Sequence, residues 1–243
     1  MPPTIEELDY QQTRLGELIL RRRRVLSLGG AEVYEVKLGD EYLMSSLFHV
    51  AEVALADIAL RMLAGDGWDV VVGGLGLGYT AAAALKYAEV ARLVVVEALA
   101  PVIDWHRRAL VPNGQILSGD PRCVFHPADF FACARGDGFD PAAAAARFDA
   151  ILLDIDHTPG HRLHTSHGVF YTIDGLRRLS AFLKPGGVFA LWSNDPPDAA
   201  FLDVMSEVFA DADGHAITFD NPLLQNTATN GVYVGRCPVS IQV

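Results

Sequence analysis

Residues 68–85 read Trp68-Asp69-Val70-Val71-Val72-Gly73, then Gly74-Leu75-Gly76-Leu77-Gly78, then Tyr79-Thr80-Ala81-Ala82-Ala83-Ala84-Leu85. The first segment is rich in β-branched residues and is typical of a buried strand, whereas the last is rich in alanine and is typical of a helix. The glycines between them permit a tight turn in which the backbone approaches a ligand at the start of the helix. This stretch therefore predicts a strand–loop–helix unit of an α/β fold.

The same alternation of short β-branched runs and helical patterns continues along the chain, as in parallel strand–helix–strand units. Further strands are expected at Leu93–Glu97, Cys123–His126, Phe148–Asp154 and Val188–Trp192, with a terminal antiparallel pair at His215–Phe219 and Gly231–Arg236. Helices are expected at Ser45–Leu63, Thr80–Ala88, Pro101–Leu110, Pro141–Ala146, Val169–Leu183 and Asp198–Ala210. We predict an α/β fold with a seven-stranded, mostly parallel sheet and helices on both faces.

Residues 1–45 have a different pattern. Leu18–Leu28 and Glu32–Leu38 favour strands bounded by glycine turns, which predicts a small N-terminal β-hairpin element before a core formed by residues 46–243. Alternation along a strand puts two of the arginines in Arg21–Arg24 on each face. A solvated edge strand, an anion site and a subunit contact are the alternative interpretations of this run.

The composition fits one core with a small appendage. The chain has 243 residues, of which 51% are hydrophobic, and its net charge of −11 disfavours a nucleic-acid partner. No run approaches the roughly 18 apolar residues of a membrane span, and the N-terminus carries acids rather than a basic leader, so we expect no membrane partner and a cytoplasmic location. The three cysteines form no C-x-x-C pair, which argues against a disulfide framework or zinc.

An acidic residue strengthens the ligand-binding interpretation of the glycine loop. Glu97 ends the next predicted strand, nineteen positions after Gly78, where a carboxylate can accept both hydroxyl hydrogens of a ribose. Tyr79 occupies the place of the third glycine in G-x-G-x-x-G, which favours an adenosyl ligand without phosphates over a dinucleotide. Asp129 and Phe130 follow the third strand and are expected to meet the adenine amino group and face. Close packing of the glycines and solvation of the acids are the alternatives.

Asp154 ends the fourth predicted strand, at the edge of the sheet where ligands bind in open α/β folds. Its carboxylate can position an amine and accept a proton, so it is the candidate catalytic residue; shaping the site is its alternative role. Four histidines follow within eleven residues: His157, His161, His164 and His167. Because Thr158-Pro159-Gly160 interrupts any helical ligand spacing, we predict a loop over the acceptor and no metal site. Asp195 is a candidate for the opposite wall.

These motifs together resemble those of class I S-adenosylmethionine-dependent transferases over residues 65–236. The matching segments are Gly74-Leu75-Gly76-Leu77-Gly78, Val95-Val96-Glu97, Asp129, Asp154 and Lys184-Pro185-Gly186-Gly187. More narrowly, the chain is similar to the spermidine synthase (polyamine aminopropyltransferase) branch, with which it shares Phe170-Tyr171, Glu52 in the helix before the core and a Tyr10-Gln11 pair. The resemblance implies a Rossmann-like class I methyltransferase fold, a role in polyamine biosynthesis and a homodimer.

The resemblance also implies the ligands. The donor is expected to be S-adenosylmethionine or its decarboxylated form, bound by Gly74, Leu75, Gly76, Gly78, Glu97, Ala98, Asp129, Phe130 and Asp154. The acceptor is expected to be a small molecule, an amine, bound by Asp156, His157, Tyr171 and Asp195.

The chain departs from the family at the acceptor motif. In the segment that corresponds to the family's D-x-x-D-P-x-G-P motif, His157 and Thr158 replace the second aspartate and the following proline. Val50 replaces a tyrosine that precedes the Glu52 position in the family. Three hypotheses follow: an aminopropyl or methyl transferase like spermidine synthase, a methyltransferase with a non-polyamine acceptor, and a non-catalytic adenosyl-binding module.

Overall fold

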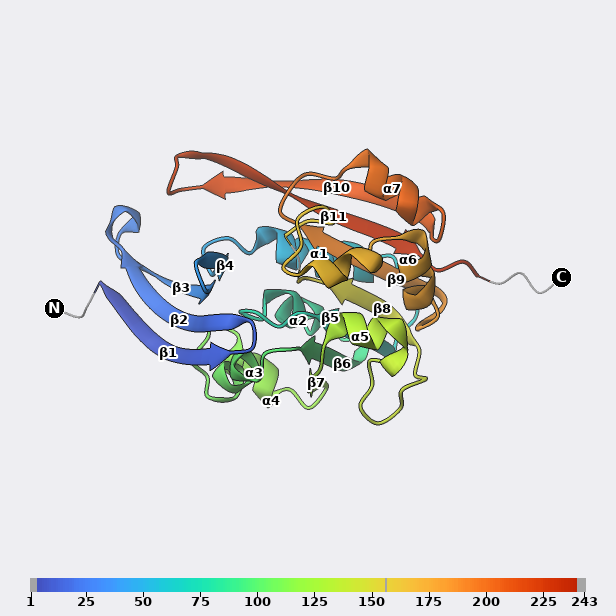
Figure 1. The fold of residues 1–243 in the computed structure, drawn as a ribbon, viewed down its shortest axis with the longest axis horizontal. Coiled ribbons are helices and arrows are strands. Elements are labelled where there is room, and N and C mark those ends of the chain that lie inside the picture. The colour runs from blue at the N-terminus through green and yellow to red at the C-terminus, as the bar shows by residue number, and fades with distance from the viewer. Residues whose placement is uncertain (1–3, 156, 240–243) are drawn as a thin grey trace.

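The computed structural model describes residues 4–155 and 157–239, which form two sheets (Figure 1). The larger has seven strands in the order β10-β11-β9-β8-β5-β6-β7. Their bounds are β5 Trp68–Gly73, β6 Val90–Glu97, β7 Cys123–Pro127, β8 Phe148–Leu153, β9 Leu183–Ser193, β10 Ala210–Asn221 and β11 Asn226–Arg236. Strands β5 to β9 are parallel, whereas β11 is antiparallel to β9 and to β10. The predicted seven-stranded, mostly parallel sheet is confirmed.

Helices cover both faces of this sheet. Their bounds are α1 Val50–Leu60, α2 Tyr79–Ala84, α3 Ala100–Arg107, α4 Gly114–Gly119, α5 Phe130–Ala132, α6 Ile173–Ser180 and α7 Ala199–Ser206, with short helices η1 Leu26–Leu28, η2 Cys133–Asp137 and η3 Thr165–Val169. Alternation along β5 divides the core, because Val70 and Val72 pack with Leu55 of α1, whereas Val71 packs with Phe130 and the α6–α7 side.

One predicted helix is wrong, and several observed helices were not predicted. The segment Pro141–Ala146 forms turns, because the Asp140 carboxylate accepts the N–H of Ala142 at 2.8 Å and is also held by Arg92. Such a side-chain bond competes with the first turn of a helix, and so short a segment does not offset the cost of nucleation. The unpredicted helices are α4, which packs on α3, together with α5 and the short helices η1, η2 and η3.

The N-terminal β element is larger than a single hairpin. It is an antiparallel sheet of four strands in sequence order, β1 Ile5–Thr13, β2 Gly16–Val25, β3 Ala31–Leu38 and β4 Glu41–Ser45. The acidic β1 lacks an apolar pattern and pairs with the arginine-rich β2, with Glu6 and Arg22 in an ion pair at 2.7 Å. The edge-strand interpretation of Arg21–Arg24 is therefore wrong, because β2 lies between β1 and β3.

The N-terminal sheet stands at the end of the core where the parallel strands finish, near α3 (Figure 1). The indole N–H of Trp105 in α3 donates to the Asp9 carboxylate of β1 at 2.6 Å, which ties the two parts together. Among the described residues, no helix is both long and apolar enough to span a bilayer.

Candidate active site

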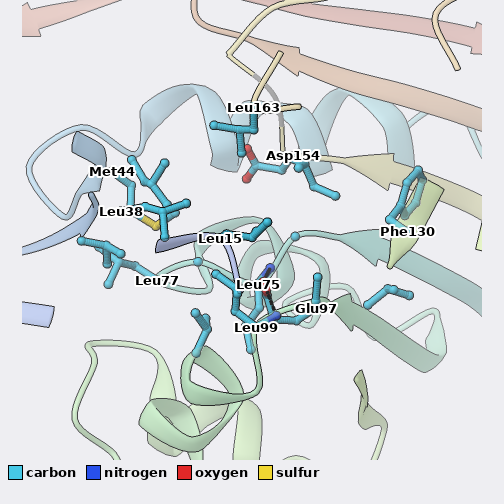
Figure 2. A pocket seen from close by; sticks show the side chains of 18 of the residues that line it. Leu15, Leu38, Met44, Leu75, Leu77, Glu97, Leu99, Phe130, Asp154 and Leu163 are labelled. Atoms are coloured by element: carbon cyan, nitrogen blue, oxygen red, sulfur yellow. Dashed lines mark hydrogen bonds between the residues drawn. The ribbon is translucent and has the colours of Figure 1, made fainter. Parts of the chain in front are cut away.

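A cavity of about 630 Å³ lies at the carboxyl ends of β5, β6, β7 and β8, with one wall from the N-terminal sheet (Figure 2). Its volume falls within the range of about 300–1,000 Å³ that small-molecule sites occupy. All nine predicted donor residues line it, namely Gly74, Leu75, Gly76, Gly78, Glu97, Ala98, Asp129, Phe130 and Asp154. The structure therefore brings together residues that are up to eighty positions apart in the chain.

The glycine loop between β5 and α2 requires glycine at its first position. Gly74 has φ +91°, and a Cβ there would lie 2.1 Å from the carbonyl oxygen of Asp154. Two side chains hold the loop by donating hydrogen bonds to its carbonyl oxygens. His106 Nε2 donates to Gly76 at 2.9 Å, and Asn113 Nδ2 donates to Leu77 at 2.9 Å. These bonds fix the backbone that faces the cavity.

His106 is buried completely, and burial lowers its pKa to about 4. The ring is therefore neutral at pH 7, with its proton on the nitrogen that faces the Gly76 carbonyl. A neutral ring can be buried beneath the loop without the cost of desolvating a charge.

Glu97 joins the glycine loop to the turn after β6. One carboxylate oxygen accepts the N–H of Leu75 at 3.0 Å, and the other accepts the N–H of Leu99 at 2.7 Å. Burial raises the pKa of Glu97, while these backbone N–H groups oppose the rise. The carboxylate thus lines the cavity from a fixed position, which favours hydrogen bonds to a pair of hydroxyl groups.

Asp129 and Phe130 follow β7 at one end of the cavity. The Asp129 carboxylate accepts the N–H groups of Phe131 at 2.8 Å and Ala132 at 3.2 Å, so it caps α5. The Phe130 ring packs against Gly73 and lies in a cluster of aromatic rings. Phe130 lines the cavity, although its side chain is almost completely buried.

Asp154 follows β8 and faces the middle of the cavity, between the positions of Leu163 and Leu15 in Figure 2. The hydroxyl of Thr80, at the start of α2, donates to its Oδ2 at 2.7 Å. Glu52 of α1 lines the same part of the cavity. Burial raises the pKa of both carboxyl groups, and the charge of Asp154 raises that of Glu52 further. Two neighbouring acids that resist ionisation form a site for a cation or for an exchangeable proton.

The histidine loop reaches the mouth of the cavity. His157, His164 and His167 line it, and the ring of His167 stacks on Phe131 at 3.8 Å between centroids. His157 Nε2 lies 3.7 Å from the exposed Glu41 carboxylate of β4. Within the described part of the chain, no group of three or more His, Cys, Asp or Glu side chains is arranged to hold a metal ion.

The remaining predicted acceptor residues do not line the cavity or cannot be placed. Tyr171 lies in the core, where its ring packs on Phe131, Phe170 and Phe201. Asp195 is exposed beyond β9 and accepts a hydrogen bond from its neighbour Asn194. Asp156 lies outside the described residues.

Tyr10 and Gln11, matched to the family's N-terminal pair, are exposed on β1 and hydrogen-bond within the N-terminal sheet. Val50, at the family's tyrosine position, is also exposed.

Several site residues were not predicted. Thr80 was visible as a polar residue opening the helix after the loop, but nothing in the sequence indicates its bond to a residue 74 positions away. His106 and Asn113 occupy helical or loop positions without a motif. Leu38 and Met44, from the ends of β3 and β4, also line the cavity.

Comparison with known proteins agrees with this geometry. No family model matches the chain. The polyamine aminopropyltransferase of Nitrosomonas europaea is 33% identical over 132 residues, which are 54% of this chain and 37% of that protein. The matched segment thus spans little more than a third of that relative.

Solved structures match far more of the chain. The spermidine synthase of Thermotoga maritima has a TM-score of 0.72 at 17% identity, covering 96% of this chain and 74% of that one. A spermidine synthase in complex with the transition state analogue AdoDATO has a TM-score of 0.68 at 17% identity, covering 96% and 73%. The resemblance inferred from the motifs is confirmed, and the fold is that of spermidine synthases.

Proposed function

We propose that this chain is a spermidine synthase-like transferase that passes the aminopropyl group of decarboxylated S-adenosylmethionine to a small amine. One observation carries the proposal. Asp154 and Glu52 lie together in the cavity, which the glycine loop, Glu97 and the N-terminal sheet also line. A carboxylate pair at this point stands where a donor held by the loop and an amine would meet.

The donor end fits an adenosyl group. The Glu97 carboxylate is fixed by the N–H groups of Leu75 and Leu99 and faces the cavity, where it would accept hydrogen bonds from the ribose. The glycine loop lines the cavity and packs against the end of β8, since a Cβ at Gly74 would lie 2.1 Å from the carbonyl oxygen of Asp154. Asp129 and Phe130 close the end where the adenine would lie.

The acid pair supplies the chemistry that an amine acceptor needs. An amine reacts only when its nitrogen has a free lone pair, so an ammonium must first lose a proton to a nearby base. The nitrogen then forms a bond to the propyl carbon, the carbon–sulfur bond breaks with its electron pair on sulfur, and a neutral thioether leaves. The second proton of the reacting nitrogen passes to Asp154, which Thr80 holds in place.

A second candidate is methyl transfer from S-adenosylmethionine itself. Arg14, in the turn between β1 and β2, lines the same cavity. A guanidinium is the side chain best suited to bind a carboxylate, and a carboxylate is the group that distinguishes this donor from its decarboxylated form. The acceptor would then be methylated by the same nucleophilic displacement.

Calorimetry with the two donors in parallel tests the proposal. We expect the decarboxylated donor to bind more tightly than S-adenosylmethionine and to react when an amine is added. Tighter binding of S-adenosylmethionine that is lost in Arg14→Leu would support the methyltransferase instead. Binding of the donor without turnover on any amine would indicate a non-catalytic adenosyl-binding module, and no binding of either would refute the proposal.

A homodimer in the cytoplasm completes the proposal and rests on the family resemblance. Light scattering coupled to size-exclusion chromatography measures the assembly, and a mass near twice the 26.3 kDa chain is expected. Fractionation of cells that express the chain measures its location, and recovery with membranes would contradict the expected location.

A further inference from the structure

The cavity has an apolar wall on the side of the N-terminal sheet. Leu38, Leu43 and Met44 line it from the N-terminal sheet, and Leu163 lines it from the histidine loop. In Figure 2, Leu38 and Met44 lie on one side of the cavity and Phe130 on the other, with Asp154 between them. An acceptor held at Asp154 therefore extends its far end toward leucine and methionine side chains.

The acidic groups of the cavity are divided between the donor end and the pair Glu52 and Asp154. Among the described lining residues the acids are Glu52, Glu97, Asp129 and Asp154. The carboxylates of Glu97 and Asp129 accept backbone N–H groups at the donor end. The pair Glu52 and Asp154 is left to bind the reacting nitrogen, so the described lining offers no second carboxylate for a distant ammonium.

The polar groups near the apolar wall include no described carboxylate that could pair with an ammonium. Trp192 lines the cavity, and its indole N–H, which pairs with no acceptor among the described residues, is itself a donor. His157 offers one acceptor nitrogen when neutral and a like charge when protonated, and its nearest acid, Glu41, is exposed at the mouth. Ser45 adds a hydroxyl acceptor, but a second ammonium would still lose its hydration without gaining an opposite charge among the described lining residues.

An apolar tail on the acceptor would bind favourably at the wall where burial of a second ammonium is unfavourable. Each buried methylene contributes about 0.8 kcal/mol, or about fourfold in affinity. We propose, on the premise that the chain is an aminopropyltransferase, that its acceptor is a primary monoamine with an apolar tail and not a diamine. The single ammonium binds at Glu52 and Asp154, and the tail lies against Leu38, Leu43 and Met44.

The test compares two acceptors of the same length. Putrescine and n-pentylamine differ only in that a methyl group replaces one ammonium. With the decarboxylated donor and the unmodified protein, we expect kcat/KM for n-pentylamine to exceed that for putrescine at least tenfold. From propylamine to hexylamine it should rise by about fourfold per methylene until the wall is filled. An equal or higher kcat/KM for putrescine would overturn the proposal. This holds also if the second ammonium of putrescine were bound by Asp156.

A pair of variants tests the role of the wall. Leu38→Asp places a carboxylate where the tail ends, and Leu38→Asn is its matched control of equal size without the charge. We expect Leu38→Asp to raise the ratio of putrescine to n-pentylamine turnover at least tenfold above the ratio in Leu38→Asn, because both variants lose contact with the apolar tail but only Leu38→Asp can bind the second ammonium. Equal ratios in the two variants would contradict the assignment of the wall, and thermal unfolding confirms that each variant folds.

Failure of the proposed reaction remains distinguishable from failure of this inference. If no amine is alkylated, calorimetry in the presence of 5′-methylthioadenosine still measures acceptor binding. Tighter binding of n-pentylamine than of putrescine would uphold the acceptor class, and tighter binding of putrescine would overturn it.

Discussion

Replacing Glu97 by glutamine should weaken the binding of an adenosyl ligand by about 10- to 150-fold. The range follows from the loss of one hydrogen bond between a carboxylate and the ribose, which contributes about 1.5–3 kcal/mol. A change of about 1.4 kcal/mol corresponds to a tenfold change in Kd. Glutamine has nearly the same size as glutamate, so the cavity keeps its shape while the charge is removed.

The same substitution should also lower the stability of the protein. Both carboxylate oxygens of Glu97 accept backbone N–H groups, from Leu75 at 3.0 Å and from Leu99 at 2.7 Å. A glutamine retains one acceptor oxygen, so its NH₂ group would face one of these donors and leave it unpaired. An unpaired buried donor costs about 1–3 kcal/mol, but removing a charge whose desolvation is unfavourable offsets part of this loss.

A cycle of two proteins and two ligands separates these effects. Calorimetry would measure the binding of 5′-methylthioadenosine and of its 2′,3′-dideoxy analogue to the wild type and to Glu97→Gln. We expect removal of the ribose hydroxyls to weaken binding to the wild type clearly more than it weakens binding to the variant. If both proteins lose the same affinity on removal of the hydroxyls, Glu97 acts only by holding the loop and our reasoning is refuted.

Three further predictions concern the residues around this loop. Asp154→Asn should reduce turnover by about 10²–10⁴-fold with donor affinity nearly unchanged, and steady-state rates that equal the wild type would contradict its role. Because burial raises the pKa of Asp154 above its ordinary value of 3.8, the folded state holds this proton more tightly than the unfolded chain. This contribution to stability is present at a pH below the ordinary pKa and is lost as the pH rises through the raised pKa. The melting temperature of Asp154→Asn should therefore fall less than that of the wild type as the pH rises through the raised pKa. An equal fall in the two proteins would contradict the raised pKa of Asp154. His106→Leu removes the N–H that donates to the Gly76 carbonyl. We expect the free energy of unfolding measured in urea to fall by about 1–3 kcal/mol and the affinity for the adenosyl ligand to fall as well. Unaltered affinity would show that the glycine loop does not depend on His106.

The regular part of the fold could be predicted because its signals are local. The alternation of Val70, Val71 and Val72 between two core faces and the glycines after them indicated a strand, a loop and an edge where ligands bind. Glu97 and Asp154 were found for the same reason, since each follows a strand whose carboxyl end reaches that edge.

The rest depends on contacts between distant segments. The bond from Thr80 to Asp154 arises only when α2 and β8 are packed side by side. Strand β1 carries acids that look unsuited to a sheet until Arg22 of β2 pairs with Glu6. Tyr171 illustrates the converse, because the motif indicated an acceptor residue whereas packing places its ring among other aromatic rings of the core.

The residues of the apolar wall and the residues that bind the donor and react come from different segments of the chain. Leu38 and Met44 precede the first strand of the large sheet, whereas the loop, Glu97 and Asp154 follow it. Met44 lies against Gly76, Trp105 binds Asp9, and Leu18, Leu20 and Val36 of the N-terminal sheet share a buried cluster with residues of the core. Exchanging residues 4–45 for those of a related chain, with these contacts retained, would therefore give a chimaera that keeps its donor while the repertoire of acceptors changes.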